Sequence, residues 1–213
     1  MAAYDLEEQE QLATLKAWWN ENGSLVTTTL SLVLIVLAAW QGWNYYQRNQ
    51  AAQASGLYAS VQKAAGAGDL KQVRESAGAI LEQYPRTAYA AMAALVSAKA
   101  HFQGGDLKTA HAQLAWVAEN AKDEGMQDIA RVRLANVMLD EKAYDDALKT
   151  LDAKHGATFD ALFLATKGDV LVSQGKKEEA GAAYKSALEK ADARDSGLRG
   201  SIQLRLDALG TAK

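Results

Sequence analysis

Histidine supplies the readiest acid–base and metal-binding chemistry in this sequence. The three histidines are His101, His111 and His155, and the chain contains no cysteine. Their spacing does not match a set of metal ligands, and none has an acidic partner at an offset typical of a catalytic pair. The lack of cysteine excludes disulfides, thiolate metal sites and thiol catalysis. We therefore interpret the histidines as structural and expect no metal, no cofactor and no catalytic residue.

A second pattern, Gly175-Lys176, is reminiscent of a phosphate-binding loop. A Walker A loop needs a glycine five residues before its second glycine and a serine or threonine after the lysine. Val170 and Lys177 stand at these positions, so this interpretation is rejected. No nucleophile elbow or dinucleotide loop occurs either, and the sequence therefore predicts a protein that is not an enzyme. An unrecognised hydrolase that uses the three histidines is kept as an alternative.

The composition favours helices as the elements that carry these residues. The chain has 213 residues, is 49% hydrophobic and 23% charged, and contains a single proline, Pro85. Alanine is abundant and loses no side-chain entropy in a helix, whereas β-branched residues are sparse. The formal net charge is −3, and no basic cluster offers a surface for nucleic acid. We predict an all-α protein with no nucleic-acid partner.

One segment is free of charge and strongly apolar. No charged residue lies between Glu21 and Arg48, and a helix needs roughly 20 largely apolar residues to cross a bilayer. We predict a transmembrane helix over residues 24–46, with the lipid bilayer as a partner. Aromatic residues at both ends suit the two membrane interfaces. These interface residues are Trp18, Trp19, Trp40, Trp43, Tyr45 and Tyr46.

Two other interpretations of this segment fit less well. A buried core helix would not usually carry aromatic residues at both ends. A cleaved signal peptide would need a basic start and a small-residue cleavage site, whereas residues 1–23 form an acidic tail. Part of this tail is predicted to be an amphipathic helix, with Leu12, Leu15 and Trp19 on one face. Too few basic residues flank the segment for the positive-inside rule to orient it, so both topologies stay open.

Residues 47–213 are predicted to form a repeat array of helical hairpins. Four similar turns cut this part of the chain, and their last residues are 37, 37 and 33 positions apart. The tetratricopeptide repeat has a period of about 34 residues. We predict a tetratricopeptide-like solenoid of about four units, with a C-terminal capping helix over residues 196–209. Val61 occupies a position that the repeat reserves for small residues, so the first unit is expected to be degenerate. The third unit is expected to have a shortened second helix.

A solenoid of this kind forms a concave groove from the first helix of each unit. Because no catalytic pattern was found, we predict that this groove binds a protein partner. In the register of the repeat, the residues expected to line it are Tyr58, Gln62, Lys99, Phe102, Gln103, Asn136, Asp140, Asp169 and Ser173.

Several segments, taken in order, resemble a known family. An acidic start is followed by Lys16-Ala-Trp-Trp-Asn-Glu-Asn-Gly23, by one apolar span, and by Trp40-Gln-Gly-Trp-Asn-Tyr-Tyr46. Farther along are Tyr89-Ala-Ala-Met-Ala-Ala-Leu95 and Ala147-Leu-Lys-Thr-Leu-Asp152. In order and spacing these segments resemble the YfgM-like family of proteobacteria, which are ancillary subunits of the SecYEG translocon with a tetratricopeptide-like domain.

The resemblance carries implications that composition and spacing do not provide. It implies a single-pass protein of the bacterial inner (plasma) membrane, with a cytoplasmic N-terminus and a periplasmic C-terminal domain. It implies association with the SecYEG translocon and with a membrane-anchored parvulin-like periplasmic chaperone. The implied function is an interaction scaffold that links emerging secretory proteins to periplasmic chaperones. The alternative function is a transmembrane stress-signalling regulator whose cytoplasmic tail sequesters a response regulator.

Overall fold

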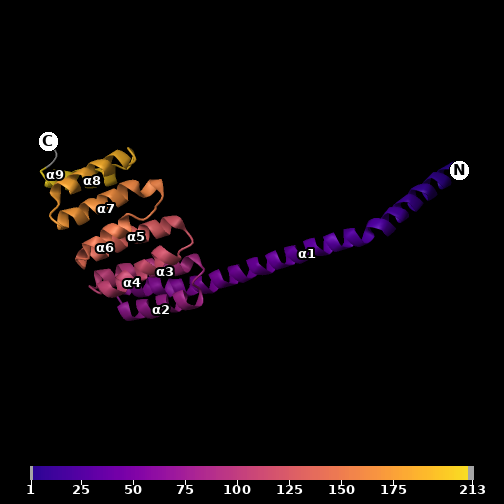
Figure 1. The fold of residues 1–213 in the computed structure, drawn as a ribbon. Helices are drawn as coiled ribbons and strands as arrows, with labels where there is room; N and C mark the ends of the chain where they lie inside the picture. The colour runs from indigo at the N-terminus through magenta and orange to yellow at the C-terminus, as the bar shows by residue number, and fades with distance from the viewer. Residues whose placement is uncertain (1, 211–213) are drawn as a thin grey trace. The chain divides into compact units, whose positions relative to one another are not determined.

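The structure is a computed structural model that describes residues 2–210, and their side chains from residue 7 onward (Figure 1). All regular structure in this range is helical, with nine α-helices, one short 3₁₀ helix and no strand. The all-α class predicted from the sequence is therefore confirmed. The chain divides into two compact units between Asn49 and Gln50.

The N-terminal unit lies within a single helix, α1, which spans Ala2–Ala67. The predicted acidic tail, apolar span and start of the repeat domain are thus parts of one helix, so no helix end marks the boundaries expected near residues 24 and 46. The local reason is that Pro is absent from this stretch and its glycines are isolated. A lone glycine inside a helix costs only about 1 kcal/mol relative to alanine.

The apolar part of α1 is exposed rather than packed into a core. Only 6% of its most apolar 18-residue window is buried, which contradicts the interpretation as a core helix. Among the described helices, α1 alone is long and apolar enough to cross a membrane, and it is a candidate membrane anchor. The six aromatic side chains expected at the membrane interfaces are all exposed on α1. Their position at the interfaces stays a prediction.

The second unit contains the end of α1 and the remaining helices. In chain order these are α2 (Leu70–Gln83), α3 (Ala88–Gln103), α4 (Leu107–Asn120), α5 (Glu124–Asp140), α6 (Tyr144–Leu151), η1 (Ala157–Phe159), α7 (Asp160–Ser173), α8 (Lys177–Lys190) and α9 (Ser196–Ala208).

Each helix from α2 onward packs against the next, and α5 also contacts α3 and α7 (Figure 1). The helices of this unit therefore form stacked hairpins, and α3, α5 and α7, which are the first helices of successive hairpins, also contact one another in sequence.

The turns predicted to be equivalent share one backbone conformation. Gly68, Gly105 and Gly175 have φ angles of 73°, 80° and 78°, and Lys142 occupies the matching position with a φ of 61°. This left-handed conformation suits glycine because glycine has no Cβ to clash with the following carbonyl. Glycine after a helix therefore ends it, and the third turn does so with a lysine.

In two of these turns the next residue is an aspartate that caps the N-terminus of the following helix. Asp69 accepts a hydrogen bond of 3.0 Å from the Gln72 amide, and Asp106 accepts one of 3.0 Å from the Thr109 amide. A side-chain oxygen at this position satisfies an N–H group that the first helical turn leaves unpaired. The Gly-Asp pairs thus encode the end of one helix and the start of the next.

The register of the repeat is visible in the core. Each turn ends on a residue that is 0% exposed, and the residues twelve before and four after it are buried as well. The positions at the turns are Val73, Ala110, Ala147 and Ala180; those before are Val61, Ala98, Ala135 and Gly168; those after are Ala77, Leu114, Leu151 and Tyr184.

Val61 is larger than the residue that the repeat usually has at its position, yet it is still a core residue. In the same unit, the position four residues after the turn holds the small Ala77. The prediction of a shortened helix is confirmed, because α6 has 8 residues whereas α2, α4 and α8 each have 14. A helix begins at Ser196 as predicted, and its role as a cap stays a prediction.

Candidate partner-binding surface

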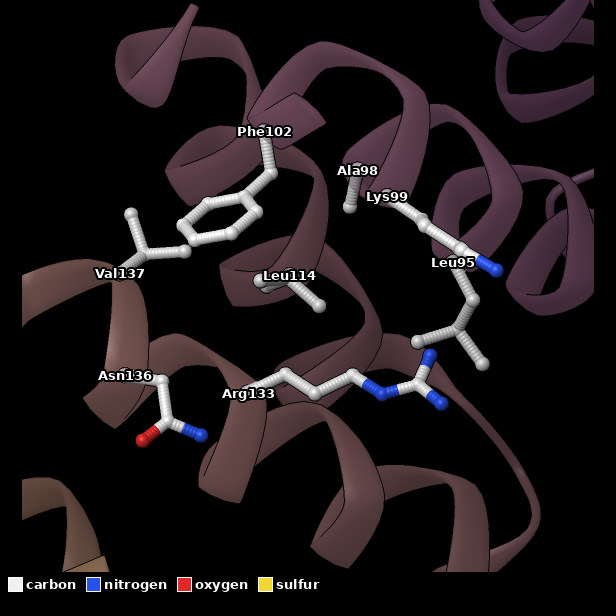
Figure 2. A pocket seen from close by; sticks show the side chains of 8 residues that line it. All are labelled: Leu95, Ala98, Lys99, Phe102, Leu114, Arg133, Asn136 and Val137. Atoms are coloured by element: carbon white, nitrogen blue, oxygen red, sulfur yellow. The ribbon is translucent and has the colours of Figure 1, made fainter. Parts of the chain in front are cut away.

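The residues predicted to line a groove lie on alternate helices, and three of them meet at one pocket. Lys99 and Phe102 lie on α3, and Asn136 lies on α5. They line a pocket of about 310 Å³ between α3, α4 and α5. Figure 2 shows its eight residues, which are Leu95, Ala98, Lys99, Phe102, Leu114, Arg133, Asn136 and Val137.

The inner surface of this pocket is apolar. Leu114 reaches it from α4 and is 3% exposed, and Ala98 and Val137 are each 2% exposed. Phe102 is different, because this large aromatic side chain is 40% exposed. A ring left half in water beside a buried apolar wall is a surface on which another apolar side chain can be buried.

One end of the pocket is cationic. Figure 2 shows the charged ends of Lys99 and Arg133 on the same side as Leu95, whereas Phe102, Val137 and Asn136 lie on the other side. Within the part of the chain that the structure describes, neither Lys99 nor Arg133 forms an ion pair or a side-chain hydrogen bond. Both cations are therefore available to an anionic group of a ligand.

Arg133 and Leu95 were not among the residues predicted to line a groove. Arg133 lies three residues before Asn136, and Leu95 lies four residues before Lys99, so each shares a helix face with a residue that was predicted. Including the residues one helical turn before each predicted groove residue would have added both to the prediction.

The other predicted groove residues make local contacts instead of meeting at this pocket. Tyr58 packs its ring against Tyr89 with ring centres 5.7 Å apart, and Gln62 donates a hydrogen bond of 3.3 Å to the Tyr58 hydroxyl. Ser173 donates a hydrogen bond of 3.1 Å to the carbonyl of Asp169 in its own helix. Gln103 and Asp140 are exposed at the ends of α3 and α5. Their part in a binding surface stays a prediction.

Asp169 takes part in a contact between helices. It accepts a hydrogen bond of 2.8 Å from the Tyr184 hydroxyl, and Arg205 Nη1 lies 3.0 Å from its second oxygen. Burial raises the pKa of the Asp169 carboxyl, while the Tyr184 hydroxyl and the Arg205 charge oppose this rise. Burial and the hydrogen bond to Asp169 both raise the pKa of Tyr184, so its phenol stays neutral. This cluster joins α7, α8 and α9.

Each histidine lies near a carboxylate that the sequence did not reveal. His101 is 1% exposed, and its Nδ1 lies 3.3 Å from Asp106 Oδ2, although neither ring nitrogen forms a hydrogen bond within the described residues. Burial lowers the pKa of His101, the nearby Arg74 charge lowers it further, and Asp106 opposes both.

The other two histidines are more exposed. His111 Nδ1 lies 2.9 Å from Glu141 Oε2, and His155 Nε2 lies 3.4 Å from Asp160 Oδ1. The ring of His155 also stacks on Phe163 at 3.8 Å. Over residues 7–210, no three His, Asp or Glu side chains come together in a way that could hold a metal ion. The described side chains thus form isolated histidine–carboxylate pairs, and no catalytic or metal-binding constellation is found among them.

Comparison with known proteins identifies the class and then the family. A family model described as "Tetratricopeptide repeat-like domain" matches residues 16–211. Stacked helical hairpins and this match together define a tetratricopeptide-repeat-like protein.

Proteins named ancillary SecYEG translocon subunit are similar along most of the chain. The one from Neisseria gonorrhoeae is 35% identical over 98% of this chain and 100% of its own length. Those from Haemophilus influenzae and Escherichia coli are 31% and 29% identical, covering 88% and 85% of this chain and 91% and 87% of their own lengths. The chain belongs to the family of ancillary SecYEG translocon subunits, which confirms the resemblance noted in the sequence.

Proposed function

We propose that this chain is a non-enzymatic, membrane-anchored interaction scaffold associated with the SecYEG translocon. The observation that carries the proposal is similarity along nearly the whole chain to proteins named for that association. The long apolar segment of α1 supplies an anchor, and the stacked hairpins supply a surface for protein partners. In its finer form, the scaffold links emerging secretory proteins to periplasmic chaperones, one of them a membrane-anchored parvulin-like chaperone.

The proposed architecture assigns four repeat units to the hairpins α1/α2, α3/α4, α5/α6 and α7/α8, with α9 as the cap. The buried register described above supports the four units. Ile202 and Leu206 of α9 are buried in one cluster with Ala187 and Ala191, which supports the cap. A terminal helix of this kind shields the apolar face that the last unit of a solenoid would otherwise expose.

The proposed domains are a cytoplasmic tail over residues 1–23, a transmembrane segment over 24–46 and a periplasmic domain over 47–213. A fusion of alkaline phosphatase to the C-terminus tests this orientation, because that enzyme is active only outside the cytoplasm. We expect an active fusion, and an inactive one when the phosphatase replaces everything after residue 20. Activity of only the shorter fusion would contradict the orientation.

Affinity purification of the full chain from membranes, in mild detergent, tests the scaffold. We expect the translocon subunits and a parvulin-like chaperone to co-purify. The matched control is the same tag on an unrelated single-span protein of equal expression. Recovery of neither partner from a well-expressed, membrane-inserted chain would contradict the proposal, whereas recovery of the translocon alone would contradict only the chaperone link.

The acidic N-terminal stretch favours one second candidate, a stress-signalling regulator whose tail sequesters a response regulator. Glu7, Glu8 and Glu10 are exposed on α1 and are available to a cytoplasmic partner. Deletion of residues 2–16 separates the two functions. The regulator predicts that a stress-response phenotype is lost while co-purification of the translocon is kept; a phenotype that survives the deletion contradicts it.

A further inference from the structure

We propose that the pocket between α3, α4 and α5 binds an extended polypeptide segment through two adjoining features. An apolar side chain of the segment packs on Phe102, and an internal Asp or Glu carboxylate of the same segment lies between Lys99 and Arg133. The inference rests on the scaffold function proposed above and names the chemistry of the polypeptide that this surface accepts.

The apolar part of the pocket has room for a large side chain. The pocket volume of about 310 Å³ is at the lower end of the range for ligand sites. Ala98 contributes only a methyl group to the wall, which leaves space between Phe102 and the buried Leu114. A phenylalanine or leucine side chain can enter this space, and an aromatic pair with Phe102 would contribute beyond the area it buries.

The charged part sets which segments are accepted. Elsewhere in this unit, Arg74, Lys167 and Arg205 each lie within 3.0 Å of a carboxylate oxygen of the chain itself. Lys99 and Arg133 have no such partner among the described residues. A guanidinium group binds a carboxylate through two parallel hydrogen bonds, and the ammonium adds a second charge on the same side. At an exposed rim these pairs add modest affinity and mainly set orientation.

The walls favour a side-chain carboxylate over a chain terminus. Sites that capture a terminal carboxylate typically surround it with free backbone N–H groups. Lys99 and Arg133 lie inside α3 and α5, where the backbone N–H groups donate to carbonyls of their own helix. Only flexible cationic side chains reach the anion here, and they suit an acidic residue within a continuing chain.

Peptide binding to the full chain in detergent micelles, followed by fluorescence anisotropy, tests the inference. The probe is a labelled nine-residue Gly/Ser peptide, blocked at both ends, with one Phe and one Glu two residues apart. Replacing its Glu by Gln is expected to weaken binding about fivefold, as a pair of rim contacts allows. Replacing its Phe by Ala is expected to weaken binding about tenfold. Added salt should weaken the Glu peptide alone.

Variants of the protein locate the contacts. Lys99→Gln with Arg133→Gln should lower the affinity for the Glu peptide to that of the Gln peptide and leave the latter unchanged. Lys108→Gln is the control, because Lys108 is an exposed cation of α4 outside the pocket. Phe102→Ala should weaken both peptides, and Leu204→Ala is its control, since Leu204 is an exposed apolar residue of α9. Circular dichroism shows whether each variant is folded.

Several results would overturn the inference. They are equal binding of the Glu and Gln peptides, unchanged binding by the double variant, and binding that requires a free C-terminus. Displacement of the peptide by vesicles of anionic phospholipid would point to a lipid occupant and would also overturn it. Failure here is distinguishable from failure of the scaffold, because co-purification of the translocon by the unaltered chain depends on none of these peptides.

Discussion

The ring of Tyr184 in α8 lies directly against the backbone of Gly168 in α7. A Cβ atom on residue 168 would overlap this ring. The same contact places the Tyr184 hydroxyl 2.8 Å from Asp169, and Arg205 of α9 completes the cluster. Because residue 168 has no side chain, the Tyr184 ring can pack directly on the backbone of α7. The hydroxyl of the same tyrosine links α7 and α8 to Arg205 of α9 through Asp169.

Gly168→Ala is expected to destabilise the protein. The added methyl group forces the Tyr184 ring or the two helices apart, and such overpacking costs about 1–3 kcal/mol. The free energy of unfolding, measured by urea denaturation, checks this. Gly78→Ala is the control, because nothing lies within 4 Å of a Cβ at this helical position. That control should instead gain about 0.5–1 kcal/mol; similar losses in both variants would contradict the close-approach argument.

Lys142→Gly is expected to stabilise the protein. Lys142 has a φ of 61°, where the equivalent turns have glycine, and a left-handed non-glycine residue costs about 1–3 kcal/mol. Glycine avoids this conformational cost, but it lowers the stability by about 0.5–1 kcal/mol because the unfolded chain has greater freedom. We expect a net gain of about 1 kcal/mol and a rise in Tm of a few degrees.

Two companion variants test the reason for this gain. Gly105→Lys reverses the change in the equivalent turn and should destabilise the protein. Lys149→Gly removes an exposed lysine from inside α6 and should cost about 1 kcal/mol. A loss of stability in Lys142→Gly would show that the lysine side chain outweighs its backbone strain.

The stability of the protein should fall as the pH falls below about 6.5, the ordinary pKa of histidine. Burial lowers the pKa of His101 in the folded state, so the unfolded chain binds a proton near pH 6.5 that the folded chain does not. Unfolding then takes up protons, and the free energy of unfolding decreases from that pH down to the lowered pKa. Urea denaturation between about pH 7 and pH 5 measures the slope, and most carboxyl groups stay ionised over this range.

His101→Gln should flatten this slope, whatever its effect on stability at neutral pH. His111→Gln retains the buried His101 and should retain the slope. The same slope in all three proteins would assign the acid sensitivity to other groups.

Arg131→Met is expected to destabilise the protein by about 2–4 kcal/mol, because it leaves a buried carboxylate without its cation. Asp128 is 2% exposed and accepts hydrogen bonds of 2.8 Å from Arg131 and 2.9 Å from the Gly156 amide. It thereby holds the segment between α6 and α7. Hydrogen exchange of residues 152–159 should accelerate together with the loss of stability.

Arg194→Met is the control for this prediction. The Arg194 side chain is 95% exposed and lies 4.0 Å from Asp192, so its removal should change stability by less than about 0.5 kcal/mol. Equal effects of the two variants would show that Asp128 does not depend on its ion pair.

Leu34→Arg is expected to weaken membrane insertion of α1. An arginine at the centre of a spanning helix costs about 2.5–3.5 kcal/mol for insertion, and Leu34 lies in the middle of the exposed apolar segment. The fraction of protein that resists extraction from membranes by alkaline carbonate should fall. Leu12→Arg, which lies before the apolar segment, should leave the carbonate-resistant fraction unchanged. Equal extraction of both variants would contradict the proposed position of the anchor.

The ends of most helices could be predicted from the sequence because they depend on neighbouring residues. Glycine after a helix, aspartate before one, and Pro85 act over a few positions. Several helix ends of the second unit lie beside such residues: α2 begins after Asp69, α3 ends before Gly104 and α4 begins after Asp106. Local patterns did not predict that α1 runs unbroken through three expected segments. An apolar span and a following amphipathic helix have no breaker between them, and helix continues by default.

The candidate binding site was predicted only in part. The register of the repeat brings Lys99 and Phe102 of α3 to the same pocket as Asn136 of α5, since i and i+3 positions share a helix face. It could not say where neighbouring hairpins leave a pocket. That depends on the volumes of buried residues such as Ala98 and Leu114, which meet only after the hairpins stack.

The sequence by itself determined the helical class, the turns, the repeat register, the apolar N-terminal segment and the family. These follow from local backbone preferences and from patterns along one chain. Only the tertiary structure decided that Gly168 accommodates Tyr184 and that Asp106 meets Arg74 and His101. It also decided that two cations without an ion-pair partner among the described residues line one end of the pocket, across from Phe102. Most of these contacts join residues far apart in the chain, and their geometry is set by how whole helices pack against one another.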